Sequence, residues 1–131
     1  MKGKRNVLIV TDGSGGIIKM AAGIAEALKG HKITVKTASE FQGNDILPAD
    51  TFFIGCENPR PDSFSYLVDL LKHVNLAGRL CGVFTSGSAG TARYLAGLVR
   101  DSEAALNPEV LLAGSEVDVK TWTQNVITHS F

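Results

Sequence analysis

Three short segments combine glycine with hydroxyl or charged side chains, and each directly follows an apolar run. The first includes Asp12-Gly13-Ser14-Gly15-Gly16, and the others span residues 57–63 and 85–91. Glycines let backbone N–H groups approach an anion closely, and the start of a helix carries partial positive charge. We therefore predict that residues 13–17 bind a phosphate, although such glycines also serve simple tight turns.

No set of side chains in the sequence indicates nucleophilic or acid–base catalysis. Ser86 and Ser88 lie in the third segment, but the G-x-S-x-G frame of a nucleophile elbow is absent. His31, His73 and His129 are far apart along the chain, which argues against a metal site or a catalytic histidine. These residues therefore provide no catalytic set, and they leave open whether the protein is an enzyme.

Two arginines and two cysteines are further candidates for functional residues, because of their charge or reactivity. Arg60 and Arg93 could pair with a phosphate or a reduced anionic ligand, but exposed, solvated charge is the commoner state of arginine. Cys56 and Cys81 lie in apolar runs, without a C-x-x-C pair or a Cys/His cluster. We predict that both are buried, reduced thiols.

The pattern of apolar residues predicts strands that alternate with helices. Residues 7–10 form an uninterrupted branched apolar run, which is typical of a strand buried on both faces. Further strands are predicted at residues 51–56, 80–84 and 110–113. Residues 32–36 alternate polar and apolar, which predicts an edge strand with one face in water. Apolar residues recur at helical spacing over residues 20–28, 67–74 and 95–106.

The ends of these helices carry recognisable signals. Gly30 and Pro108 are predicted to end the first and third helices, and Asp62 or Ser63 to cap the second. Residues 116–131 predict a short or atypical last element, because several of them are β-branched. Strands that alternate with helices need crossover connections, so we expect a mainly parallel sheet with helices on both faces.

Length and charge restrict the class of protein. A chain of 131 residues with 44% apolar content suits one domain, predicted to span residues 1–131. Its 13 basic and 13 acidic residues give no basic surface for nucleic acid or membranes. The apolar run after the basic N-terminus is too short for a signal or a membrane span, so we predict a cytoplasmic protein.

The order and spacing of these elements resemble the flavodoxin family. Residues 7–28 resemble its first strand, phosphate loop and helix, with Ala21, Ile24, Ala25 and Leu28 in the helix stripe. Residues 50–55 resemble the third strand with its final glycine, and residues 76–84 the entry to the fourth. The resemblance covers about residues 6–115 and implies a flavodoxin-like, doubly wound, five-stranded parallel sheet in the order 2-1-3-4-5 within a three-layer α/β/α sandwich.

The resemblance also implies FMN as cofactor, with electron transfer to a partner protein or a quinone. The implied phosphate loop is 12–17, and the implied ring loops are 57–62 and 85–90. The implied cofactor residues are Asp12, Gly13, Ser14, Gly15, Gly16, Ile17, Glu57, Asn58, Pro59, Arg60, Thr85, Ser86, Gly87 and Ser88. Asp12 stands where the family has a hydroxyl, and neither 57–63 nor 85–91 contains the Trp or Tyr that commonly stacks on flavin. Pro59 and Pro61 could contact the ring instead.

Two other functions remain open from the sequence. In the first, the chain is an interaction or regulatory module that has the flavodoxin fold but does not retain flavin. A receiver-like phospho-signalling domain would place acidic, hydroxyl and lysine side chains after successive strands, and here these would be Asp12, Glu57, Thr85 or Ser86, and Lys120. A short final helix could also leave an apolar sheet face open, which would favour a homodimer.

Overall fold

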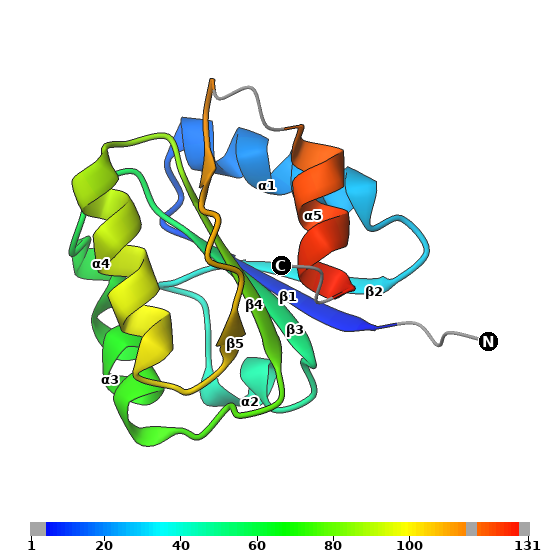
Figure 1. Cartoon of the computed structure of the whole chain (residues 1–131). Helices are drawn as coiled ribbons and strands as arrows, with labels where there is room; N and C mark the ends of the chain where they lie inside the picture. The colour runs from blue at the N-terminus through cyan, green and yellow to red at the C-terminus, as the bar shows by residue number, and fades with distance from the viewer. Residues whose placement is uncertain (1–4, 115–117, 129–131) are drawn as a thin grey trace.

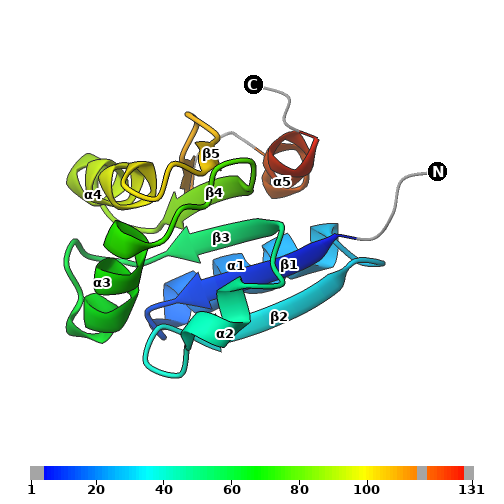
Figure 2. The same cartoon turned by 90° about the horizontal axis from the view of Figure 1, so that it is seen from below.

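The computed structural model describes residues 5–114 and 118–128, and its centre is a parallel β-sheet (Figure 1). The strands are β1 (Asn6–Thr11), β2 (Lys32–Thr37), β3 (Thr51–Gly55), β4 (Leu80–Thr85), β5 (Ala105–Leu106) and β6 (Leu111–Leu112). The sheet order is β2-β1-β3-β4-β5, and β6 also pairs with β4. Figure 2 shows β2, β1, β3 and β4 side by side in this order. The predicted order is confirmed.

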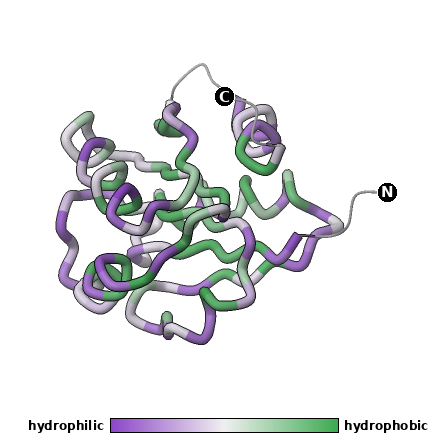
Figure 3. The backbone as a smooth tube through the Cα atoms, turned by 60° about the horizontal axis from the view of Figure 1, so that its bottom comes forward, coloured by the Kyte–Doolittle hydropathy of each residue, from purple (hydrophilic) through white to green (hydrophobic). Residues whose placement is uncertain are grey.

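Helices cover both faces of the sheet. They are α1 (Gly15–Ala27), α2 (Gly43–Ile46), the 3-10 turn η1 (Asp62–Phe64), α3 (Ser65–His73), α4 (Ala89–Arg100) and α5 (Val119–Ile127). One apolar core packs α1 and α5 against the sheet, and a second packs α2, α3 and α4 against the opposite face (Figure 1). Within β3, Phe53 belongs to the first core, and Phe52 and Ile54 to the second. Side chains of a strand alternate between faces, so a central strand is mainly apolar on both faces, and the interior of the fold is largely hydrophobic in Figure 3.

The edge strand β2 differs from the central strands, as predicted. Its residues are partly or largely exposed, and Val35 keeps 52% of its surface in water. Val35 borders a shallow, mainly apolar hollow of about 330 Å³ with Ile18 and Ala22 of α1. The alternating pattern of residues 32–36 therefore identified the edge position correctly.

The third predicted helix ends earlier than its apolar pattern indicated. Helix α4 stops at Arg100, and Glu103 then adopts a positive φ of 65°. The hydroxyl of Ser102 donates to the Val99 carbonyl, so it competes with continuation of the helix. Leu106 therefore lies in β5 rather than in the helix, and Pro108 does not end the helix.

The fifth strand is present as two short pieces. β5 pairs with the beginning of β4, and β6 pairs with its end. Between them Asn107 accepts a hydrogen bond from the Glu109 amide through its side chain, which forms a turn. The predicted strand over residues 110–113 is therefore shorter, and residues 105–106 share its place in the sheet.

The predicted caps of the second helix are wrong. Asp62 and Ser63 lie inside the 3-10 turn, and the α3 N-cap is Phe64, which makes no side-chain capping bond. Phe64 is fully buried in the core.

The last element is short but well packed. Asp118 caps α5 by accepting a hydrogen bond from the Thr121 amide. Trp122 is fully buried; its ring lies 5.6 Å from that of Phe53, and its indole N–H donates to the Glu109 carbonyl. Because α5 covers this face of the sheet, the open apolar face expected there is not found among the described residues, and that reason for self-association is removed. Residues 115–117 and 129–131, and with them His129, lie outside the described residues.

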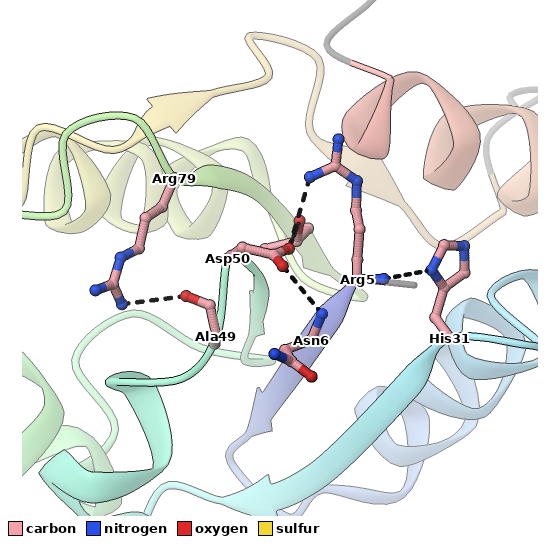
Figure 4. A network of polar contacts seen from close by, with 7 residues as sticks. Arg5, Asn6, His31, Ala49, Asp50 and Arg79 are labelled. Carbon is pink, nitrogen blue, oxygen red and sulfur yellow. Dashed lines mark hydrogen bonds and ion pairs between the residues drawn. The ribbon is translucent and has the colours of Figure 1, made fainter. Parts of the chain in front are cut away.

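A polar network ties the amino ends of the strands together (Figure 4). Asp50 accepts a hydrogen bond from the Asn6 amide and pairs with Arg5 at 3.6 Å, while the Arg5 amide donates to His31. Arg79 donates to the Ala49 carbonyl. These contacts lie at the end of the sheet opposite the predicted ligand loops and serve the fold.

Candidate functional site

The three predicted ligand loops meet at the carboxyl ends of β1, β3 and β4. Gly16 approaches Ser86, since a Cβ added to Gly16 would lie 3.4 Å from the Ser86 hydroxyl oxygen. The Asp12 carboxylate accepts a hydrogen bond from the Glu57 amide at 2.9 Å. A Cβ added to Gly87 would lie only 2.0 Å from the Glu57 carbonyl oxygen. All three loops are therefore in mutual contact, which the sequence alone could only suggest.

The first loop is a compact turn held by its own side chains. The Gly13 amide donates to the Thr11 hydroxyl, and Gly13 has a φ of +85° that favours glycine. The Ser14 amide and hydroxyl both donate to one oxygen of Asp12, at 2.9 and 2.7 Å. Ser14 is the N-cap of α1, but its hydroxyl is thereby committed to Asp12 and makes no capping bond.

The first turn of α1 supplies free backbone donors. Its residues Gly15, Gly16 and Ile17 have no carbonyl four residues back within the helix, so their amides are available to an acceptor. No acidic side chain lies in this turn, and Gly15 and Gly16 are exposed. The Ile17 side chain, in contrast, is fully buried, so this residue can offer only its amide. These amides can hold an anion.

The loop after β3 is mostly exposed. Glu57, Asn58, Pro59 and Arg60 are all exposed, and Arg60 has a positive φ of 53°, which is uncommon outside glycine. Within the described part of the chain, the side chains of Asn58 and Arg60 make no hydrogen bond or ion pair. These side chains are free to contact a ligand or a partner.

The loop after β4 is fastened to the loop after β3. The Gly87 amide donates to the Thr85 hydroxyl at 2.8 Å, and the Thr91 hydroxyl donates to the Glu57 carbonyl at 3.3 Å. Ser88 is the N-cap of α4 and makes no side-chain capping bond. The sequence reasoning missed Thr91; its place in the first turn of the helix after a predicted loop was the available signal.

Ser86 is the one residue of the site with a buried and unsatisfied side-chain oxygen. Its hydroxyl has no hydrogen-bond partner among the described residues, and it faces Gly16. Buried polar atoms are nearly always paired, so an orphan hydroxyl next to free helix-end amides suits a ligand that accepts hydrogen bonds. The neighbouring cavity of about 450 Å³ is lined by Gly16, Lys19, Met20, Gly23, Ser86, residues 111–114 and Val119. Lys19, which the sequence reasoning did not select, adds a positive charge there.

The titratable groups near the site are not tuned for nucleophilic chemistry. Burial, with a smaller contribution from the Asp12 charge, raises the pKa of the Cys56 thiol to about 12. Burial also raises the pKa of Tyr94, whose hydroxyl is buried without a partner among the described residues. Cys56 and Cys81 are free, buried thiols, as predicted. The raised pKa keeps the Cys56 thiol protonated at neutral pH.

Arg60 and Arg93 belong to a second hollow beside the site. A groove of about 760 Å³ between α3 and α4 is lined by both arginines, Tyr94 and three aspartates. Both arginines are exposed, and neither forms an ion pair with another described residue. Arg60 reaches this groove from the loop after β3, and Arg93 from α4.

The receiver-like arrangement finds little support in these positions. Lys120 is exposed in the first turn of α5, and no described acidic side chain pairs with it. Asp12 is engaged by Ser14 and by the Glu57 amide. Among residues 5–114 and 118–128, no group of three His, Cys, Asp or Glu side chains could hold a metal ion.

Comparisons with known proteins agree on the architecture. No protein-family model and no curated protein sequence matches the chain. Among solved structures, it is similar to a short-chain flavodoxin associated with a PDU bacterial microcompartment, at 16% identity and a TM-score of 0.81, covering 98% of this chain and 100% of that one. Oxidised flavodoxin 2 from Bacillus cereus matches at 21% identity and a TM-score of 0.76, covering 96% and 99%.

A Fusobacterium nucleatum flavodoxin bound to flavin mononucleotide is also similar, at 10% identity and a TM-score of 0.75, covering 95% of this chain and 98% of that one. At these identities the likeness defines the architecture. The chain has the flavodoxin-like α/β fold. In the described part of the chain, no helix has both the length and the apolar character needed to cross a membrane.

Proposed function

We propose that this chain is a flavodoxin-like, FMN-binding protein that acts in electron transfer. The observation that carries the proposal is the meeting of three loops where the free amides of the α1 first turn lie beside the orphan Ser86 hydroxyl. The similarity of the fold to flavodoxins, one of them bound to FMN, supports the same choice of ligand.

The residues present fit a phosphate-bearing flavin, with Asp12 as the exception. The amides of Gly15, Gly16 and Ile17 would hold the phosphate, because helix-end N–H groups and the helix dipole favour an anion. Ser86 and Gly87 would border the ring on one side, and residues 57–60 on the other. Bound FMN would supply one- or two-electron chemistry, while the chain binds, orients and electrostatically tunes it.

The proposal includes a single flavodoxin-like domain in the cytoplasm that exchanges electrons with a partner protein or a quinone. Two buried, free thiols suit a reducing compartment. The exposed loop at residues 57–60, next to the proposed ring site, is the natural contact for such a partner. Balanced net charge implies that strong electrostatic steering does not select the partner.

Equilibrium dialysis of the purified chain against FMN tests the proposal. We expect saturable binding at one site with a dissociation constant in the micromolar range. Gly16→Val should weaken FMN binding, because a branched side chain would fill the space between the α1 amides and Ser86. Gly97→Val is the matched control, since Gly97 lies late in α4 with open space around its Cβ position. Absence of FMN retention by the folded wild-type chain would refute the proposal.

One observation favours a second candidate, a flavodoxin-fold interaction module that retains no flavin. Asp12 already accepts hydrogen bonds from Ser14 and Glu57, so part of the loop's donor capacity is used within the protein. A folded chain that binds neither FMN nor riboflavin would favour this module over the electron carrier.

A further inference from the structure

The Asp12 carboxylate acts within the protein as an anion already bound to the ligand loops. One of its oxygens accepts hydrogen bonds from the Ser14 amide and hydroxyl, and the other accepts from the Glu57 amide. These are two amides and a hydroxyl, the kind of donors that hold a phosphate oxygen. The carboxylate therefore joins the loops after β1 and β3 without any ligand.

The same carboxylate places a negative charge beside the free amides of α1. Asp12 is only two residues before the Ser14 N-cap and is partly buried, so solvent screens its charge less than that of an exposed side chain. A phosphate dianion at the α1 amides would meet this charge at short range, whereas a ligand that ends in a neutral hydroxyl would not.

We infer that Asp12 is a specificity-determining residue that lowers the preference of this site for phosphorylated flavin over unphosphorylated flavin. The inference rests on the proposed flavin-binding function and concerns the relative affinities for FMN and riboflavin. Asp12 thus has two effects. It preorganises the loops after β1 and β3, and it disfavours a ligand that places a phosphate dianion at the α1 amides.

Dissociation constants for FMN and riboflavin, measured by equilibrium dialysis, test the inference. Asp12→Asn removes the charge but keeps an oxygen that can accept from Ser14; water can satisfy the exposed Glu57 amide. We expect FMN affinity to rise about tenfold or more, because the charge repulsion is lost, and riboflavin affinity to change less than about twofold. The FMN gain should shrink at high salt.

Two further variants make the result specific. Asp12→Ser supplies a second neutral side chain if Asp12→Asn does not fold, as judged by urea unfolding. Glu26→Gln is the control for net charge, because Glu26 is exposed near the far end of α1. In this control both flavins should keep their affinity within about twofold.

The possible outcomes separate this inference from the proposed function. If both flavins bind and the ratio of their affinities is the same in wild type and both Asp12 variants, the inference is wrong and the flavin proposal stands. If only the Asp12 variants bind FMN, the inference is supported and the wild-type chain is not an FMN carrier. If no variant binds either flavin, both proposals are refuted.

Discussion

Gly87 offers the sharpest test of how the candidate site is assembled. A Cβ at this position would lie 2.0 Å from the Glu57 carbonyl oxygen and 3.1 Å from the Thr91 hydroxyl. Gly87 is not among the glycines with positive φ, so the backbone conformation itself admits alanine. Gly87→Ala therefore perturbs the contact of this loop with the Glu57 carbonyl and with Thr91 of α4.

The expected magnitude follows from that contact. The two loops must part by about 1.4 Å to restore an ordinary contact distance. Overpacking of this kind costs about 1–3 kcal/mol, and the Thr91–Glu57 hydrogen bond, which would stretch, contributes about 1 kcal/mol. We expect Gly87→Ala to lower the free energy of unfolding by about 2–4 kcal/mol, a large fraction of the usual total.

Urea unfolding followed by Trp122 fluorescence measures this change, because Trp122 is the only tryptophan and is fully buried. The slope of unfolding free energy against urea should stay constant while the midpoint falls. Gly97→Ala is the matched control; it has open space and lies within α4, so helix propensity should stabilise it by about 0.5–1 kcal/mol. A Gly87→Ala chain as stable as wild type would refute the close approach of the two loops.

Other consequences of the packing can be measured in the same way. Gly82→Ala should cost about 1–3 kcal/mol and change the near-UV circular dichroism of Trp122, because the added Cβ would lie 2.8 Å from that ring; an unchanged spectrum and midpoint would contradict this. Arg79→Ala should lower unfolding free energy by about 1–3 kcal/mol, since the guanidinium donates to two backbone carbonyls before β3. Because burial raises the pKa of the Cys56 thiol from 9.0 to about 12, the unfolded chain loses this proton first as pH rises. Stability should therefore fall between about pH 9 and 12, and Cys56→Ala should show a shallower decline in urea unfolding over the same pH range.

Local sequence patterns correctly predicted the strands whose apolar pattern reflects how deeply they are buried. Three mainly apolar segments became β1, β3 and β4, because a strand covered by helices on both faces buries nearly all of its side chains. The alternation in residues 32–36 predicted the edge strand β2 for the converse reason. The glycine-rich turn after β1 likewise predicted a helix start with free amides, since only a tight turn connects that strand to α1.

Local patterns failed where competing contacts decided the outcome. The stripe that extended to Leu106 predicted a longer helix, but Ser102 and the positive φ of Glu103 end α4 and return the chain to the sheet. The β-branched residues of α5 indicated a weak element, yet burial of Trp122 against Phe53 and Gly82 holds it in place. Tertiary packing overrides helix propensity because a buried aromatic ring contributes more than the propensity differences of a single turn.

The sequence by itself determined which residues form the central strands, that those strands run parallel, and which three loops lie at their carboxyl ends. Only the tertiary structure decided how these loops touch: Asp12 on the Glu57 amide, Gly87 against the Glu57 carbonyl, and Ser86 facing Gly16. The physical reason is that periodicity depends on neighbours within a few residues, whereas these contacts join residues 30 to 70 positions apart. Their geometry is set by how the whole sheet twists and packs.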